Sequence, residues 1–273
     1  MNRLDQQWFK KLIDSVNQLP LLPRDSLVLG ETVIGSVVSD AFNAVMVNQT
    51  FVGHDDLRKI QTTDGLIWKI TGDATKVLQK IAHVLREAHY ARVAEQWQDE
   101  PLAVFDALGQ QIAVVERGVI RALGMASQGV HLVGYTPDQQ VWIQQRAMNK
   151  ANDPGLWDTL MGGMVSAADT IDTALARETL EEAGLGLEQL TNLHRARHFT
   201  MRMPASDDQG LGYVIERIDW FEGVVPEDVL PLNRDGEVQQ FKRVGKIELR
   251  SMLQNNKFTL EAALIFALLD GIF

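Results

Sequence analysis

A chain of 273 residues with 45% apolar side chains can bury the cores of two modest domains, and this composition excludes an intrinsically disordered protein. The formal net charge of −10 argues against nucleic acid as a bulk partner, because binding to a phosphate backbone needs many lysines and arginines. The absence of cysteine excludes disulfides, thiolate metal sites and a thiol nucleophile.

The opening segment MNRLDQQWFKKLIDSVNQL predicts an amphipathic helix, because its large apolar residues recur at helical spacing. It lacks the continuous apolar stretch and the small-residue cleavage site of a signal peptide. The longest clear apolar run, at 262–269, is well short of the roughly 18 residues that span a membrane, and it predicts a buried terminal helix. We therefore expect a cytoplasmic protein without a membrane partner.

The next hundred residues predict a small α+β domain. Its expected elements are two strands around a turn at Gly30, a short helix, strand-like pieces around Gly53 and Trp68, a long helix over 74–93, a hairpin around Gly109 and a short helix over 119–123. Glycines and polar residues over 124–129 place a domain boundary near residue 125. The domain 1–125 carries no acid cluster, phosphate loop or nucleophile, so we expect it to shape a substrate pocket or an oligomer contact, or simply to stabilise the chain.

The second domain, 126–273, predicts strands on both sides of one helix. Its expected elements are a hairpin over 129–146 that turns at Pro137 and Asp138, a helix within 162–185, strands over 194–203, 213–221 and 238–244, and helices over 247–255 and 260–269. Such an order is typical of an α/β or α+β fold in which the sheet lies between helices.

The segment GGMVSAADTIDTALARETLEEAGL, at 162–185, places three glutamates within five residues between glycine-bearing turns. Residues three and four apart share a helix face, so these glutamates should point the same way. That face carries Ile171, Ala174, Leu175, Glu178, Glu181 and Glu182. Inward-facing carboxylates repel one another unless a cation joins them, and magnesium is the usual cation of all-oxygen sites.

A solvated surface helix is the main alternative for these glutamates, since acids on such helices usually alternate with lysines. This helix has no lysine, and Arg177 is its only basic residue. Because the acids also continue the apolar stripe, the residues alone support a solvated face and an inward-facing metal site about equally.

The same segment resembles the Nudix box, in which a glycine precedes an acid, an Arg-Glu pair, two further glutamates and a closing glycine. The matching positions are Gly163, Asp169, Arg177, Glu178, Glu181, Glu182, Gly184 and Leu185. Two positions depart from the family's pattern, with Asp169 in place of glutamate and Thr179 in place of an aliphatic residue. The shorter side chain of Asp169 is expected to weaken its ion pair with Arg177.

This resemblance implies that residues 126–273 form a Nudix fold, a mixed β-sheet in an α/β/α sandwich. It also implies a hydrolase that uses magnesium, or manganese as a substitute, to offset the charge of a diphosphate and activate water. The implied metal ligands are the Gly163 carbonyl, Glu178, Glu181, Glu182 and Glu237. Arg177 would orient the glutamates by ion pairs.

Further site residues follow from the resemblance. Glu237 stands where many Nudix enzymes place a distal glutamate as a metal ligand or base, although Asp-Gly before it is also an ordinary hairpin turn. Arg146 and Lys150 would neutralise the diphosphate, unless they form surface ion pairs instead. His131 would contact the organic part of the substrate, with a packed histidine as the alternative.

Segments outside the box resemble one Nudix branch, the proteins related to the Nudix domain associated with thiamine pyrophosphokinase. They are ERGVIRALGMASQGVHLVGY, VWIQQRAMNKANDPGLWD and PLNRDGEVQQFKRV. That branch implies hydrolysis of thiamine diphosphate, and preferentially its oxidised forms, to the monophosphate. Tyr135, Trp142 and Trp157 would supply aromatic walls, and a pocket for the uncharged oxidised ring should present it no carboxylate.

Three other functions are weighed against this one. A broader nucleotide-sugar or dinucleotide diphosphatase would use the same box. A non-catalytic Nudix-fold sensor is less supported, because the box glutamates are all present and no helix-turn-helix is recognisable. An isopentenyl-diphosphate isomerase relies on a cysteine, which this chain lacks. We therefore expect a small-molecule diphosphate as the partner and no nucleic acid, and a homodimer is left open.

Overall fold

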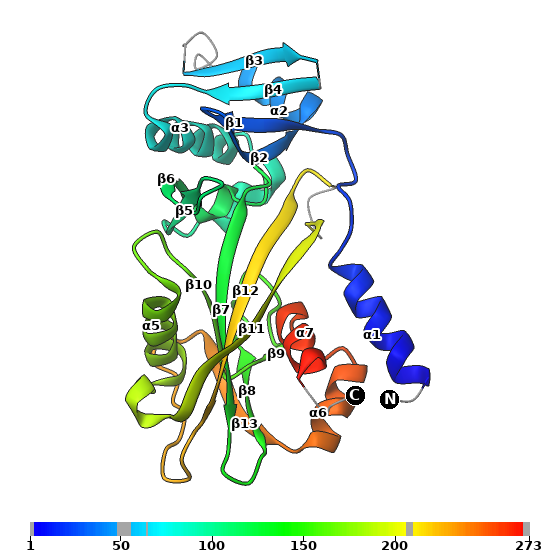
Figure 1. Ribbon diagram of the computed structural model, residues 1–273, viewed down its shortest axis with the longest axis vertical. Helices are drawn as coiled ribbons and strands as arrows, with labels where there is room; N and C mark the ends of the chain where they lie inside the picture. Colours follow the sequence, from blue (N-terminus) through cyan, green and yellow to red (C-terminus); the bar gives the residue numbers. More distant parts are fainter. Residues whose placement is uncertain (1–2, 48–55, 64, 206–209, 270–273) are drawn as a thin grey trace.

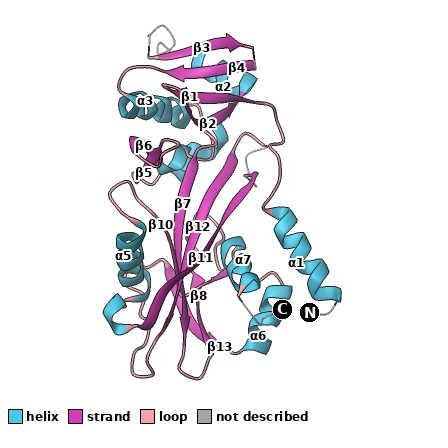
Figure 2. Ribbon diagram, viewed as in Figure 1, coloured by secondary structure: helices cyan, strands magenta, loops and turns pink. Residues whose placement is uncertain are grey.

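The computed structural model describes residues 3–47, 56–63, 65–205 and 210–269. It shows an elongated molecule with a four-stranded sheet at one end and a seven-stranded sheet at the other (Figure 1). Helices lie on both sides of the larger sheet, as the colouring by secondary structure makes clear (Figure 2). The predicted α+β composition, with a mixed sheet between helices, is confirmed.

The smaller sheet has the strand order β2-β1-β4-β3. β1 (Arg24–Leu29) and β2 (Thr32–Val38) form the predicted hairpin, and Gly30 in its turn has a φ of +61°, a left-handed conformation that favours glycine. β3 (Leu57–Thr62) pairs antiparallel with β4 (Gly65–Ile70), which contains Trp68. The strand-like piece expected around Gly53 lies outside the described residues.

Two helices, α2 (Ser39–Val47) and α3 (Ala74–Glu87), add apolar side chains to the core of this sheet. The single helix predicted over 74–93 is wrong beyond Glu87. The chain breaks there into a 3-10 turn, η2 (Tyr90–Arg92), and a short helix, α4 (Val93–Gln96), because His89, Ala91 and Arg92 have positive φ angles that no right-handed helix contains. Tyr90 and Val93 are buried, so tertiary packing overrides the helical spacing.

The connection between the two sheets contains the hairpin predicted around Gly109, formed by β5 (Pro101–Phe105) and β6 (Gln111–Glu116). The helix predicted over 119–123 is instead a 3-10 turn, η3 (Arg117–Val119), followed by further turns. Glu116 caps η3 by accepting a hydrogen bond from the Gly118 amide at 3.2 Å. This short, tightly bonded segment leads directly into the larger sheet.

The larger sheet has the strand order β11-β12-β7-β8-β13, with two short strands at its side. Its hairpin and its three later strands match the prediction, whereas β9 and β10 were not predicted as strands. β12 runs parallel to β7, and the other pairs are antiparallel. The strands are β7 (Ala126–Tyr135), β8 (Val141–Arg146), β9 (Trp157–Asp158), β10 (Met161–Met164), β11 (Thr191–Pro204), β12 (Tyr213–Val224) and β13 (Val238–Val244).

Two apolar cores flank this sheet. α5 (Ile171–Ala183) closes the core on one face, and α6 (Lys246–Gln254) and α7 (Leu260–Leu268) close the core on the other. The opening helix, α1 (Arg3–Ser15), packs Trp8, Leu12 and Ile13 against the α6–α7 core. The domain boundary near residue 125 stays a prediction. It would place α1 in the first domain, although α1 packs against the core of the second. Among the described helices, none has the length and apolarity needed to cross a membrane.

Asp219 on β12 is fully buried and joins three strands of the larger sheet. Arg217 Nε donates to Asp219 Oδ2 at 2.9 Å, Arg195 on β11 forms a second ion pair, and Gln128 Nε2 on β7 lies 3.4 Å away. Burial raises the pKa of this carboxyl, but the bonds to Arg217 and Arg195 outweigh burial and hold the pKa below its usual range.

We expect Asp219→Asn to lower the free energy of unfolding at pH 7 by about 1.5–3 kcal/mol, the usual range for hydrogen bonds to charged groups. Because the folded pKa is lowered, this stabilisation is present above the unfolded pKa of about 3.9 and is lost as pH falls through the folded value. Urea unfolding of the wild type and Asp219→Asn at pH 7 and pH 3 measures this difference in the free energy of unfolding. A difference between variant and wild type that does not shrink in acid would contradict this account.

Candidate active site

α5 is the predicted loop–helix–loop of the box, and both of its ends are fixed locally. At its start, the Thr173 amide donates to Thr170 Oγ1 at 3.2 Å and the Thr170 amide donates to Thr173 Oγ1 at 2.8 Å, a reciprocal cap. At its end, Gly184 has a φ of +65°, the left-handed conformation that commonly terminates a helix. The helix therefore presents its glutamates at fixed positions.

The three glutamates of α5 do not share one environment. Glu182 is 3% exposed, and the side chain of Glu178 is 13% exposed, whereas that of Glu181 is 48% exposed. The expectation that all three point inward is therefore wrong for Glu181. A step of about 100° separates neighbouring residues on a helix, so Glu181 lies at the flank when Glu182 faces the sheet.

Glu182 is held by two hydrogen bonds to one of its oxygens. Its Oε2 accepts from Gln144 Nε2 on β8 at 2.8 Å and from the Gly162 amide at 3.0 Å. Burial nevertheless raises the pKa of Glu182 to about 8, and burial raises the pKa of Glu178 to about 7 despite the charge of Arg177. These two carboxylates therefore resist ionisation together, and a bound cation would relieve that resistance.

Arg177 forms the ion pairs predicted for it. Its Nη2 lies 2.8 Å from Asp169 Oδ2, and its Nη1 lies 2.9 Å from Glu178 Oε1 and 3.1 Å from Glu181 Oε2. The shorter side chain of Asp169 does not prevent the pair, because Arg177 Nε also donates to the same oxygen at 3.0 Å. Arg177 thus orients the acids of the box.

The strand β10, which precedes α5, has glycine at two positions where side chains approach its backbone closely. A Cβ atom at Gly163 would overlap the carboxyl group of Glu178, and one at Gly162 would overlap the ring of His131. Gly163 has an ordinary strand pairing with Val130 on β7, so space rather than backbone conformation explains the glycine. Its main chain is consequently placed beside the carboxylate of Glu178.

Glu178 and Glu182 line a cleft beside the inner strands β7, β8 and β12 of the larger sheet, with about 760 Å³ of space, open solvent included. Five further predicted residues line the same cleft: His131, Arg146, Lys150, Gly163 and Glu237. Lys150 forms an ion pair with Glu237, whose side chain is 45% exposed. Arg146 donates from Nε and Nη2 to the Asn152 carbonyl at 3.3 and 3.2 Å.

His131 is both packed and part of the cleft wall. Its Nδ1 lies 3.0 Å from Thr159 Oγ1 and 3.5 Å from Asp158 Oδ1. Burial lowers the pKa of His131, but the hydrogen bond and charge of Asp158 outweigh burial and raise it. The imidazole is thus oriented by neighbours on the loop that leads into the box.

The three aromatic residues expected as substrate walls are absent from the lining of this cleft in the described chain. Trp157 packs against the α6–α7 core, where its amide donates to the Lys257 carbonyl at 2.9 Å. Trp142 is buried under the guanidinium of Arg243, and the Tyr135 hydroxyl donates to Glu222 at 3.1 Å. The substrate contact expected for Trp157 stays a prediction, and the side chain packs against the α6–α7 core.

Several cleft residues were not predicted from the sequence. They are Arg117, Arg121, Asp158, Glu216 and Glu261. Burial, together with the charge of Glu216, raises the pKa of Glu261 to about 7. No local signal marks these residues, since Glu216 alternates in an ordinary strand and Glu261 occupies the first turn of a terminal helix.

The chemistry of the cleft fits a hard divalent cation. Seven acidic residues line it: Asp153, Asp158, Glu178, Glu182, Glu216, Glu237 and Glu261. In the part of the chain that the structure describes, no three histidine, cysteine or acidic side chains are grouped closely enough to hold a metal ion by themselves. Magnesium usually keeps several waters and takes one or two carboxylates plus substrate phosphates, and Glu178, Glu182 and the Gly163 carbonyl suit that kind of binding.

Comparison with known proteins gives one family. Residues 125–264, which are 140 of the 273 residues, match the family described as NUDIX domain. Nudix hydrolase 20, chloroplastic, of Arabidopsis thaliana is 28% identical over 149 residues, 53% of this chain and 38% of that protein. A Saccharomyces cerevisiae protein described as uncharacterised is 25% identical over 182 residues, 62% of this chain and 53% of that protein.

Among solved structures, a crystal structure from Deinococcus radiodurans matches 59% of this chain and 92% of its own, with 17% sequence identity and a TM-score of 0.46. The chain spans about half or less of the length of the two curated relatives above.

Proposed function

The chain belongs to the NUDIX domain family, and from this membership together with the geometry of the cleft we propose that it is a divalent-metal-dependent hydrolase of small-molecule diphosphates. One observation carries the proposal above the rest. Two box glutamates with raised pKa values, the half-buried Glu178 and the buried Glu182, share a cleft with the basic residues Arg146 and Lys150. A site in which paired acids lie beside basic side chains suits a metal ion that also binds phosphate oxygens.

Glu178, Glu182 and the Gly163 carbonyl would hold the cation, with Glu237 as a further ligand or base. When bound, the cation offsets the charge of the diphosphate and lowers the pKa of a coordinated water. Arg177 keeps Glu178 in place through their ion pair. Arg146 and Lys150 bind phosphate oxygens, and Glu237 at the rim accepts a proton from the attacking water. Glu181 lies at the edge of the site, and its role as a metal ligand stays a proposal.

For the substrate, we propose thiamine diphosphate and its oxidised forms, cleaved to the monophosphate. The support is the resemblance of the segments around the box to the branch related to thiamine pyrophosphokinase. Glu216 lines the catalytic cleft, where its carboxylate is available to a cationic ring. A carboxylate favours the cationic ring of intact thiamine diphosphate, so the intact form belongs in the proposal beside the oxidised ones.

We expect the specificity constants for oxothiamine diphosphate and thiamine diphosphate to exceed that for a nucleoside triphosphate. Steady-state assays with magnesium, detecting the monophosphate product, measure all three, and chelation with EDTA should abolish turnover. Manganese should restore it. If the nucleoside triphosphate or a nucleotide sugar is the better substrate, the hypothesis of a thiamine diphosphate hydrolase is wrong and that of a broader diphosphatase replaces it.

A further inference from the structure

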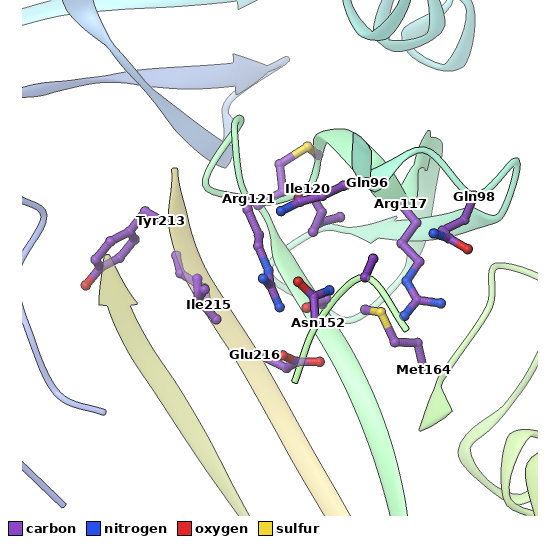
Figure 3. A pocket seen from close by; sticks show the side chains of 14 residues that line it. Gln96, Gln98, Arg117, Ile120, Arg121, Asn152, Met164, Tyr213, Ile215 and Glu216 are labelled. Carbon is purple, nitrogen blue, oxygen red and sulfur yellow. The ribbon is translucent and has the colours of Figure 1, made fainter. Parts of the chain in front are cut away.

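A second cavity adjoins the catalytic cleft on the side of the smaller sheet. It comprises about 560 Å³ of space, open solvent included, and shares five lining residues with the cleft: Arg117, Arg121, Asn152, Met164 and Glu216 (Figure 3). Residues of the region before 125 form one wall, and residues of the larger sheet form the other. A ligand in the catalytic cleft can therefore extend into space that both regions enclose.

The two arginines on the first wall differ in their charge partners. Arg117 Nη1 lies 2.5 Å from Glu100 Oε2, so its charge is already compensated. Arg121 is half-buried, and among the residues that the structure describes its guanidinium has no ion pair or hydrogen bond. Figure 3 shows its side chain extending from the turn after η3 toward Asn152 and Glu216. A half-buried cation of this kind favours an anionic ligand.

The backbone that carries Arg121 is fixed from both sheets. The Arg121 carbonyl accepts hydrogen bonds from the Tyr213 amide at 2.8 Å and the Gly124 amide at 3.0 Å. Two residues later, the Leu123 carbonyl accepts from the Ser36 amide at 2.8 Å. The guanidinium therefore starts from an ordered backbone, which reduces the entropy lost when it binds a ligand.

The remaining wall of the second cavity suits an organic group. Ile120, Met125 and Ile215 supply apolar surface. Glu216 lies at the junction with the catalytic cleft, because it lines both spaces. Apolar side chains beside polar groups that fix orientation are common in small-molecule sites.

We propose that Arg121 binds the phosphoryl group that stays attached to the organic part of the substrate, and that the second cavity holds the organic part. This assignment rests on the proposed diphosphate hydrolysis. Arginine suits the task because its planar guanidinium can donate two parallel hydrogen bonds to phosphate oxygens. The region before residue 125 thereby becomes part of the substrate site, through one residue that is distant from the metal-binding acids in sequence.

The test measures binding separately from turnover. Calorimetric titration with AMP and with thiamine monophosphate, in EDTA, compares the wild type with Arg121→Ala and Arg121→Lys. We expect Arg121→Ala to raise the dissociation constant about tenfold or more, as loss of a charged hydrogen bond does, and Arg121→Lys to raise it less. With a diphosphate substrate and magnesium, Arg121→Ala should raise KM by a similar factor and leave kcat within about threefold.

Arg58→Ala, which removes an exposed arginine from β3 of the smaller sheet, is the matched control and should change neither constant. Unchanged monophosphate binding in Arg121→Ala overturns the inference, even if the wild type hydrolyses diphosphates. A wild type that binds neither monophosphate also overturns it. A wild type that binds them through Arg121 but cleaves no diphosphate refutes the proposed function alone. If Arg121→Ala does not fold, binding by Arg121→Lys decides.

Discussion

Replacement of Glu182 by glutamine is expected to lower kcat by on the order of 10²-fold or more, as loss of a metal ligand or acid–base group typically does. Glu182 is the most deeply buried acid of the box, and Gln144 and the Gly162 amide fix its position. Glutamine keeps the size of the side chain but removes the charge that would bind the cation. Steady-state kinetics at saturating magnesium measure the loss.

The same variant should be as stable as the wild type, or more stable, when metal is chelated. Burial raises the folded pKa of Glu182 to about 8, above its ordinary value of 4.5. The wild type therefore has its full stability below the unfolded pKa and loses this contribution as pH rises through about 8. Glutamine has no such loss, so the difference in thermal midpoint should grow in favour of Glu182→Gln between pH 5 and pH 9.

Glu248→Gln is the matched control, because Glu248 lies on α6 and forms an exposed ion pair with Lys242. Its kcat should equal that of the wild type. Near-normal turnover by Glu182→Gln at saturating magnesium would refute the assignment of the box as the catalytic site. If the thermal midpoints of the wild type and Glu182→Gln fall equally as pH rises, the pKa argument is refuted while the kinetic one stays intact.

Gly163→Ala is expected to reduce kcat by about 10²-fold through the position of a carboxylate rather than its loss. The added methyl group would overlap the carboxyl group of Glu178, so that side chain must swing away from its present place. Displacement of a catalytic group by about 1 Å can cost this much activity. Turnover assays combined with thermal melts separate the kinetic effect from unfolding.

Gly245→Ala controls for the loss of a glycine as such. Gly245 precedes α6, has a φ of −81°, and has open space where a Cβ atom would lie. Its alanine variant should retain wild-type turnover, with at most a small loss of stability at the start of the helix. If Gly163→Ala also keeps kcat within about threefold, the position of Glu178 does not limit catalysis.

The sequence predicted the elements that depend on local interactions. The glycine at the end of α5 and the ion pair between Asp169 and Arg177 both lie within one segment, so spacing along the chain is enough to place them. The hairpin before the box and the three strands after it also follow from alternation and turn residues. The long helix ending at 93 failed because burial of Tyr90 and Val93 decided the backbone there.

The sequence also grouped residues that the fold brings together from separate elements. Lys150 and Glu237 were predicted for one site through the family resemblance, and they form an ion pair across 87 positions. His131 and Arg146 line the same cleft as the box glutamates. Such pairings cannot be derived from periodicity, because periodicity gives the face of an element and not its neighbour.

By itself, the sequence determined the family, the helix that carries the acids and the glycines that give those acids room, since these depend on residue type at fixed spacing. Only the tertiary structure decided which side chains share the cleft. It turned Glu181 to the flank, packed Trp157 in a core, and brought Arg121 and Glu216 to the edge of the site from two different elements. The physical reason is that burial and charge compensation depend on packing between elements, and one-dimensional spacing contains no information about that packing.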